Sequence, residues 1–580
     1  MATTTGSAAD PGARTTGLRL AGAGVGVVAT ALGLVLLVRP FASLAVLVVV
    51  VVLGLVVEGV RELLVERDRW RWLRAGVFLA GAVAVLVWPG LTIRLLATLL
   101  GVVLVSSGLL DLARGWRERG VARWALGVGA VASLVLGALA LAWPDVSVLV
   151  VAVLFGVRLA MAGVSLLWDA VTGGRGRGTQ RRPGVWHLAR SLVALALALV
   201  LLGVSHLVRS GAPVPDDFYV APDRQPSEAG QLLRAEPFSR GVPAGADGWR
   251  ILYSTTRQDG TPAVASAVAI APETRGTDPL ALVAWAHGTT GFAEGCAPSL
   301  AREPFESGAF FLADRVIAEG WALVATDYVG LGTAGPHPYL IGEGEAPSVL
   351  DAIRAMRQLD EVTLSDQTVV WGHSQGGGAA LWTGVLAPAY APDLPLAGVA
   401  ALAPASNLPV LAAGLTTQGS ALFASYVMQA YSEIYPDVEF DDYIRPGART
   451  IVREMAQRCL AEPGVLVSVA TALALDQPIW SAAPDTGALG DRLRENIPSG
   501  AIQAPLLVAQ GEDDSLVLPS AQQEYVEARC RAGYAVDFRR YPGRDHVPLV
   551  EADSPLVPEL LAWTRDRFDG APAQDTCGTG

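Results

Sequence analysis

The sequence contains no lysine, so all 43 of its basic residues are arginine. It has four cysteines, all after residue 295, and six histidines. Neither a C-x-x-C pair nor a histidine-rich stretch occurs, which argues against a metal site, and no motif calls for a cofactor. Acidic residues are scarce in 1–210, with 9 Asp or Glu against 20 Arg, whereas the remainder has 46 against 23. The chain therefore joins two different halves, with net charges of +11 and −23, near residue 210.

Long apolar runs fill the first half, and a mean hydropathy of +0.40 is high for a soluble chain of 580 residues. Seven runs approach the ~20 residues that a helix needs to cross a bilayer. A signal peptide would account for only one of them. We expect an all-α transmembrane bundle at 17–208, after a tail at 1–16. Its spans are expected at 17–38, 41–60, 75–88, 91–112, 124–143, 146–168 and 188–208.

Arginine marks one side of this bundle. Three alternate connections, 61–74, 114–123 and 175–182, each carry four or five arginines, and the N-terminal tail has Arg14 and Arg19. Positively charged loops stay in the cytoplasm, so the N-terminus is predicted to be cytoplasmic. An odd number of spans then delivers residue 210 and everything after it to the outer face.

The spans also repeat. A proline opens a helix and a glycine follows nineteen residues later in three units, which pair Pro40 with Gly59, Pro89 with Gly108 and Pro144 with Gly163. Gly101 and Gly156 add a second match. Small residues on one helix face allow close packing between helices. The pattern predicts three helical hairpins plus a seventh helix, and it resembles the HdeD-like short-repeat membrane proteins over about 17–170.

Ionisable residues are few in the middle of these spans. Glu58, Arg94 and Arg158 lie where they could reach an interface, so no substrate path is indicated. The simplest interpretation of the first half is that it anchors the protein in a membrane. A segment rich in Pro and Asp at 209–216 is the expected linker to the second half.

Short apolar runs alternate with helical patterns from about 217 to 570, which predicts a mostly parallel sheet covered by helices. Helices are expected at about 347–359 and 377–388, and residues 571–580 form a tail. The clearest strands are expected at Val264–Ile270, Leu280–Ala286, Trp321–Thr326, Thr368–Gly372, Leu396–Leu402, Pro505–Gln510 and Val536–Tyr541.

The strand Thr368–Gly372 runs directly into Ser374 and then into a glycine-rich helix start. This is the pattern of a nucleophile elbow, in which a strained turn raises a serine hydroxyl above the sheet and only small residues fit around it. A bare G-x-S-x-G motif is weak, but the preceding strand and the following small-residue helix supply its context. Ser374 is therefore the candidate nucleophile.

A serine nucleophile needs a base, and the order of residues selects one. In α/β-hydrolases the nucleophile comes first, then the acid, then the histidine. Five of the six histidines lie before Ser374, which leaves His546, just after the last predicted strand. The acid should follow the preceding strand, where the spacing G-x-x-D-x-x-V selects Asp514 and leaves Asp513 as a rival.

An oxyanion hole needs backbone N–H groups directed at the developing negative charge. One should come from Gln375, directly after the nucleophile. The other should come from the His287-Gly-Thr-Thr-Gly291 loop, through either Thr289 or Thr290, which the sequence does not separate.

Five short sequence motifs, taken together and in their order along the chain, are typical of one family. They are Ile251-Leu-Tyr-Ser-Thr-Thr, His287-Gly-Thr-Thr-Gly291 followed by Cys296-Ala-Pro-Ser, Asp327-Tyr-Val-Gly-Leu-Gly332, Gly335-Pro-His-Pro-Tyr339 and Gly372-His-Ser-Gln-Gly376. Over about 217–570 the chain resembles the secretory lipase family, which includes fungal lipase A. The resemblance implies an α/β-hydrolase core with a helical cap, here at about 406–500, that binds acyl chains. The chain departs from the family in having membrane spans where a cleavable signal peptide is expected.

The four cysteines allow three pairings. The family resemblance and their order favour Cys296–Cys459, which would tie the core to the cap, and Cys530–Cys577, which would hold the tail. Disulfides require an oxidising compartment. This agrees with the extracytoplasmic location that the arginine pattern predicts for the catalytic domain.

The expected function is a membrane-anchored serine lipase or carboxylesterase acting on lipid or small ester substrates, with membrane lipids around its helices. An acyltransferase with the same triad is one alternative. An envelope stress or binding membrane protein with an auxiliary hydrolase domain is another. Nucleic acid is not an expected partner, because the strongly acidic second half would repel a polyanion.

Overall fold

The structure, a computed structural model, describes residues 71–87, 93–142, 183–209 and 213–578 except 225–227, 274–277, 418 and 476, and scattered positions elsewhere before 168. It divides into two compact units. The first comprises Met1–Leu207, Pro446–Ile451 and Val469–Pro478, and the second comprises Val208–Arg445, Val452–Ser468 and Ile479–Gly580.

The N-terminal unit is helical where it is described. Its helices are α3 (Arg71–Val87), α4 (Ile93–Gly115), α5 (Val121–Ala142) and α7 (Pro183–Arg209), at four of the seven predicted spans. Within the described residues, α5 alone is both long enough and apolar enough to cross a membrane. The predicted spans at 17–38, 41–60 and 146–168 lie largely outside the described residues.

The repeated glycines lie where helices approach each other. A Cβ atom on Gly108 of α4 would come within 3.0 Å of the Ala130 carbonyl oxygen of α5. One on Gly59, the equivalent position of the preceding repeat, would lie 2.9 Å from Leu79 Cγ in α3. At both positions a side chain would force the neighbouring atoms to shift, so glycine allows the helices to approach closely there. Gly163, the third member, lies outside the described residues.

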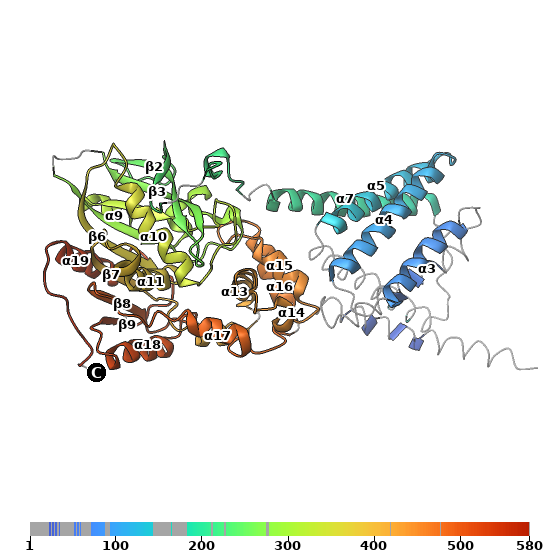
Figure 1. Ribbon diagram of the computed structural model, residues 1–580. Coiled ribbons are helices and arrows are strands. Elements are labelled where there is room, and N and C mark those ends of the chain that lie inside the picture. Colours follow the sequence, from blue (N-terminus) through green and yellow to red (C-terminus); the bar gives the residue numbers. More distant parts are fainter. Residues whose placement is uncertain are drawn as a thin grey trace, which may run out of the picture. The chain divides into compact units, whose positions relative to one another are not determined.

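The C-terminal unit is built on a nine-stranded sheet of order β1-β2-β3-β5-β4-β6-β7-β8-β9 (Figure 1). The first three strands and their junction with β5 are antiparallel, and the pairs from β5 through β9 are parallel. The strands are β1 (Leu232–Pro237), β2 (Ala246–Thr256), β3 (Pro262–Pro272), β4 (Leu280–Ala286), β5 (Ala322–Thr326), β6 (Leu364–His373), β7 (Leu396–Leu402), β8 (Leu506–Gly511) and β9 (Asp537–Tyr541).

All seven strands expected from the sequence are present, within a few residues of the expected ends. The antiparallel strands β1 and β2, at one edge of the sheet, were not among the predicted strands. In β1 the exposed half, Ala235–Pro237, is polar or small, so the strand has no apolar run to reveal it. An edge strand of this kind is held by its pairing with β2, which the local sequence does not encode.

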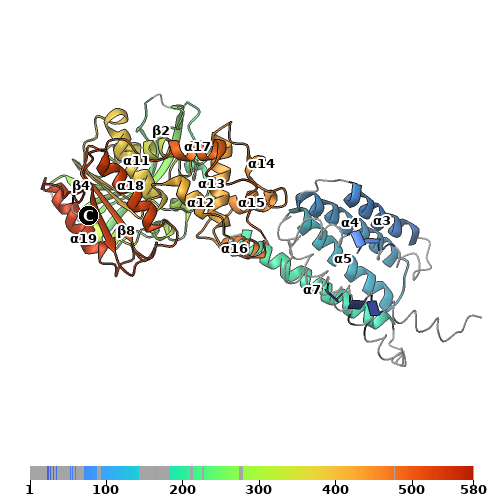
Figure 2. The same cartoon turned by 90° about the horizontal axis from the view of Figure 1, so that it is seen from below.

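Both faces of the central strands are buried, as parallel strands require. Successive residues of β6 alternate between two clusters: Val370 packs into one, with α10 (Gly342–Met356), α11 (Gln375–Tyr390) and α18 (Pro519–Arg531). Val369 and Trp371 pack into the other, with α9 (Ala313–Ala318) and α19 (Leu556–Phe568). The helices therefore cover the sheet on both sides (Figures 1 and 2).

Helix α10 begins five residues before the predicted start at 347. The prediction placed Pro347 at the first turn, where proline costs nothing, but here it lies inside the helix. Between β7 and β8 the chain forms a helical insert, as predicted. Several short 3-10 and α segments occur earlier in the sequence, before β7. The insert contains α12 (Leu408–Gly414), α13 (Ala421–Ile434), α14 (Phe440–Tyr443), α15 (Arg449–Ala456), α16 (Val465–Ala474) and α17 (Gly487–Glu495).

Candidate active site

Ser374 occupies the turn between β6 and α11 in a strained conformation, with φ +59° and ψ −121°. A non-glycine residue rarely adopts a positive φ. The turn is also too tight for side chains nearby: a Cβ on Gly372 would lie 2.0 Å from the Gly376 carbonyl oxygen, and one on Gly376 would lie 1.9 Å from the Ala286 carbonyl oxygen. These contacts explain the glycines around the serine and give the nucleophile elbow its geometry.

A line of hydrogen bonds joins three residues from three loops. The Ser374 hydroxyl lies 2.8 Å from His546 Nε2, and His546 Nδ1 lies 2.8 Å from Asp514 Oδ2. A carboxylate only accepts, so His546 Nδ1 donates to Asp514 and Nε2 is free to accept from Ser374. This is the arrangement that lets an imidazole take a proton from a serine hydroxyl.

Asp514, rather than Asp513, faces the histidine. Asp514 is 3% exposed, and its carboxylate also accepts hydrogen bonds from Gln510 Nε2 and from the backbone N–H groups of Leu516 and Val517. Asp513 is exposed to solvent. The four accepted bonds fix the carboxylate and compensate for its burial.

The two loops that carry the acid and the base are tied to each other. The carboxylate of Asp545 accepts hydrogen bonds from the backbone N–H of Ser515, at 2.9 Å, and of His546, at 2.8 Å. These contacts lower the pKa of Asp545, which keeps it ionised. This charged acceptor fixes the loop of the candidate acid, Asp514, relative to the loop of the candidate base, His546.

A small cavity borders Ser374. Its open volume of about 20 Å³ holds about one water molecule. Apart from Thr289, Tyr339, Ser374 and Gln375, its walls are apolar, with Leu340, Ala405, Leu411, Leu415, Phe423, Leu516 and Val517. Several of these come from the helical insert, so the insert covers the serine with apolar surface.

Of the two candidate threonines, Thr289 lines this cavity. Its hydroxyl is hydrogen-bonded to the Tyr339 hydroxyl at 2.9 Å. Thr290 is 2% exposed, and its carbonyl oxygen accepts a hydrogen bond from the Leu460 N–H of the insert. Gln375, the other candidate donor, is the first residue of α11 and also lines the cavity.

Two histidines that the sequence order set aside are deeply buried. Burial lowers the pKa of His287 to about 4 and that of His337 to about 3, so both rings are neutral near pH 7. The ring of His287 lies against Tyr328, and its Nε2 is 3.3 Å from the Asp327 carbonyl oxygen. His337 contacts Gln375 through Nε2, and the histidine hydrogen-bonded to the Ser374 hydroxyl is His546.

Cys296 is bonded to Cys459, with Cα atoms 5.2 Å apart. Cys296 follows the loop that carries Thr289, and Cys459 lies in the insert after α15. The bond fixes part of the insert next to the loop that borders Ser374.

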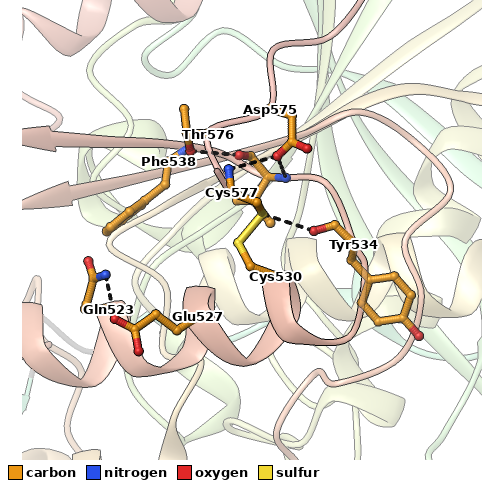
Figure 3. The surroundings of a disulfide bond; sticks show 9 residues. Gln523, Glu527, Cys530, Tyr534, Phe538, Asp575, Thr576 and Cys577 are labelled. Carbon is orange, nitrogen blue, oxygen red and sulfur yellow. Dashed lines mark hydrogen bonds between the residues drawn. A yellow bond between two sulfur atoms is a disulfide. The ribbon is translucent and has the colours of Figure 1, made fainter. Parts of the chain in front are cut away.

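Cys530 is bonded to Cys577 and fastens the C-terminal segment to the end of α18 (Figure 3). Neighbouring hydrogen bonds hold the same segment along β9: the Thr576 hydroxyl accepts from the Phe538 N–H, and the Asp575 carboxylate accepts from the Val536 N–H. The described part of the tail predicted at 571–580 is thus fixed beside β9 through Asp575, Thr576 and Cys577.

Sequence reasoning missed two buried polar residues beside the site. His373 was set aside because it lies before Ser374 in the sequence, yet its Nε2 contacts the main-chain carbonyl oxygen of His546. Glu345 lay just before the predicted helix and was not considered, although its carboxyl group contacts Gln375. The segment Leu340–Pro347 carries two acidic residues, the exposed Glu343 and the buried Glu345, and no local sequence signal separates them.

Comparisons with known proteins relate the C-terminal half to lipases. Residues 308–576 match the family model described as secretory lipase. Lipase A of Moesziomyces aphidis is 25% identical over 422 residues, covering 67% of this chain and 88% of that protein. The secreted triacylglycerol lipase LIP2 of Malassezia globosa is 27% identical over 419 residues, covering 67% and 89%.

The fold has a counterpart of known structure, and the N-terminal half has a match of its own. Lipase A of Candida antarctica superimposes with a TM-score of 0.52 at 20% identity, covering 63% of this chain and 88% of that one. Residues 24–85, 73–132 and 128–203 each match a short repeat of unknown function, three copies as the proline and glycine spacing predicted. The C-terminal half is therefore an ester hydrolase with an α/β-hydrolase fold, similar to the secretory lipases.

Proposed function

We propose that this protein is a membrane-anchored, extracytoplasmic serine lipase or carboxylesterase that works through an acyl-enzyme. The observation that carries the proposal is the hydrogen-bonded line from Asp514 through His546 to Ser374, which ends at an apolar cavity. Each element of the line has the donor and acceptor that nucleophilic attack on an ester requires.

In the proposed mechanism, Ser374 Oγ attacks the ester carbonyl carbon while His546 Nε2 takes the hydroxyl proton. Asp514 holds the ring in the correct tautomer and stabilises the imidazolium. The tetrahedral oxyanion is stabilised by backbone N–H groups of Gln375 and Thr289. His546 then protonates the leaving alcohol. A water molecule, deprotonated by His546, attacks the acyl-enzyme and releases the acid.

The apolar cavity supports an acyl group as the part of the substrate that is bound there. Leu411, Leu415 and Phe423 come from the helical insert and offer no hydrogen-bonding side chains. Since the open volume is about 20 Å³, an acyl chain of more than a few carbons requires the insert to move. Among the relatives named above, the Malassezia globosa protein is described as a triacylglycerol lipase, whose substrate carries acyl groups.

Two independent features support the location. The disulfides Cys296–Cys459 and Cys530–Cys577 need an oxidising compartment. The arginine-rich loops 61–74, 114–123 and 175–182 favour a cytoplasmic N-terminus, and seven spans then carry residue 210 across. We propose that the helical half serves as the anchor.

The test is turnover of a series of p-nitrophenyl esters, from acetate through butyrate and octanoate to palmitate, by the full chain in membranes. Ser374→Ala is expected to lower kcat on the order of 10⁶-fold. Turnover by that variant at the wild-type rate would contradict the proposal. An added alcohol acceptor separates the two enzymatic alternatives, because an acyltransferase forms a new ester in preference to the free acid.

A further inference from the structure

A buried carboxyl group lies directly behind the proposed oxyanion hole. Glu345, in the first turns of α10, is 1% exposed. Its Oε1 accepts a hydrogen bond from Gln375 Nε2 at 2.6 Å and another from the Leu340 N–H at 3.1 Å. Gln375 is the residue whose backbone N–H should face the oxyanion. The contact with Glu345 therefore restrains a residue of the proposed oxyanion hole through its side chain.

The second hydrogen of the Gln375 amide is also used. Its Nε2 lies 3.0 Å from His337 Nε2. An amide nitrogen only donates, so His337 Nε2 accepts, and His337 Nδ1 carries the proton toward the Val329 carbonyl oxygen 3.3 Å away. The Gln375 side chain is thus fixed by two acceptors, and with it the first turn of α11.

The same carboxyl group also reaches the other side of the oxyanion hole. Leu340, which donates to Glu345, has a positive φ of +58° and therefore needs outside contacts to hold its conformation. The adjacent Tyr339 hydroxyl is bonded to Thr289 Oγ1 at 2.9 Å. The Leu340 carbonyl oxygen accepts from the Tyr431 hydroxyl of α13, in the insert. Glu345 is therefore linked directly to Gln375 and, through two adjacent residues, to Thr289.

We propose that Glu345 is a positioning residue that holds the two sides of the oxyanion hole, Gln375 and Thr289, in register. The inference rests on the proposed function, since an oxyanion hole has meaning only for acyl transfer. Glu345 does not contact the reacting atoms, and it acts through the residues that do.

The protonation state of Glu345 gives this role a distinct signature. Burial raises its pKa to about 8, although its two hydrogen bonds act in the opposite direction. The titratable groups that face it are neutral near pH 7: burial raises the pKa of Tyr328, Tyr339 and Tyr431 and lowers that of His337. A neutral Glu345 leaves the oxyanion hole free of negative charge. Its ionisation at higher pH would place a negative charge behind donors that must stabilise an oxyanion, and kcat should fall.

The experiment compares kcat and KM for p-nitrophenyl butyrate across about pH 6 to 10, using the full chain in membranes. The wild type should lose kcat above about pH 8. Glu345→Gln, which resembles the neutral acid and keeps an acceptor oxygen, should keep kcat at pH 7 within a few-fold and lose this alkaline decline. Glu345→Leu should lower kcat by about 10- to 100-fold at all pH values while KM changes little, because displaced oxyanion-hole donors stabilise the transition state less without altering ground-state binding.

Asp351→Asn is the matched control. Asp351 is a second buried carboxyl group of α10, with a pKa raised to about 6, but it contacts Tyr390 and Arg354, away from Ser374. This variant should keep the alkaline decline of the wild type. A Glu345→Gln variant with the wild-type pH profile, or a Glu345→Leu variant with wild-type kcat, would overturn the inference.

The outcomes separate the two proposals. A wild-type chain that turns over no ester contradicts the proposed function itself. An active wild type with kcat unchanged between about pH 7 and 10 contradicts only the role of Glu345, and this measurement needs no variant to fold. Thermal unfolding of each variant shows whether a loss of kcat reflects a loss of folded protein.

Discussion

His373 donates a hydrogen bond through Nε2 to the main-chain carbonyl oxygen of His546, 3.0 Å away. Burial lowers the pKa of His373 to about 3, so the ring stays neutral and can hold its proton on Nε2. The residue before the proposed nucleophile, Ser374, thus fixes the backbone of the proposed base, His546. The two rings lie 4.7 Å apart, so His373 also limits how His546 can tilt.

Replacing His373 tests this clamp. His373→Phe keeps a flat ring but removes the donor, and kcat is expected to fall about tenfold, the value of one neutral hydrogen bond. His373→Gln keeps an N–H donor and should retain more activity. Steady-state kinetics on both variants decide the matter. Equal losses in the two would mean that ring packing, and not the hydrogen bond, is what the base requires.

Asp514 and Asp513 offer a matched pair. Asp514→Asn should lower kcat about 10⁴-fold, because an amide in place of the carboxylate favours the wrong tautomer of His546. Asp513→Asn, at the exposed neighbouring position, should change kcat less than about twofold. The measurement is kcat for a short-chain ester. A large loss at Asp513 with a small one at Asp514 would reassign the acid.

The acyl cavity predicts a change in chain-length preference. Phe423 lines the cavity from α13, and Phe423→Ala should enlarge it. We expect kcat/KM for octanoate relative to butyrate to rise about tenfold, since each buried methylene contributes of order 1 kcal/mol. Phe440→Ala, elsewhere in the insert, is the control and should leave the ratio unchanged. An unaltered ratio in Phe423→Ala would place the acyl chain in a different part of the molecule.

The two disulfides should differ in what they control. In the chain-entropy model, closing 163 residues between Cys296 and Cys459 stabilises by about 5 kcal/mol, and closing 47 between Cys530 and Cys577 by about 4 kcal/mol. Both double Ala variants should therefore unfold at lower temperature. The first should also lose kcat, because it frees the insert beside Thr289. Loss of kcat in the second alone would contradict this division.

Membrane topology is tested with reporter fusions. A reporter that is active only outside the cytoplasm should work when fused after residue 210 and fail when fused after Gly120, in an arginine-rich connection. A cytoplasmic reporter should give the opposite pattern. Activity of the cytoplasmic reporter at residue 210 would contradict the seven-span topology and move the hydrolase to the other side.

The sequence alone located the catalytic half, the seven strands β3–β9 and the position of Ser374, because these depend on local patterns. Strands buried on both faces are continuous apolar runs, and the tight turn at Ser374 needs glycine at Gly372 and Gly376. His546 could be named because α/β-hydrolases have a fixed order of residues and the chain has few histidines. The apolar spans and repeated glycines of the first half are local patterns of the same kind.

Tertiary structure decided what depends on distances between remote segments. Asp513 and Asp514 are adjacent in sequence, and only the path of the loop after β8 turns one toward His546 and the other toward solvent. Thr289 borders Ser374 because β4 and β6 pair in parallel and bring their ends together. Glu345 lies 30 residues before Gln375, and no spacing rule links them. Their contact arises because α10 and α11 pack on the same face of the sheet, which places the buried carboxyl group of Glu345 against the Gln375 side chain.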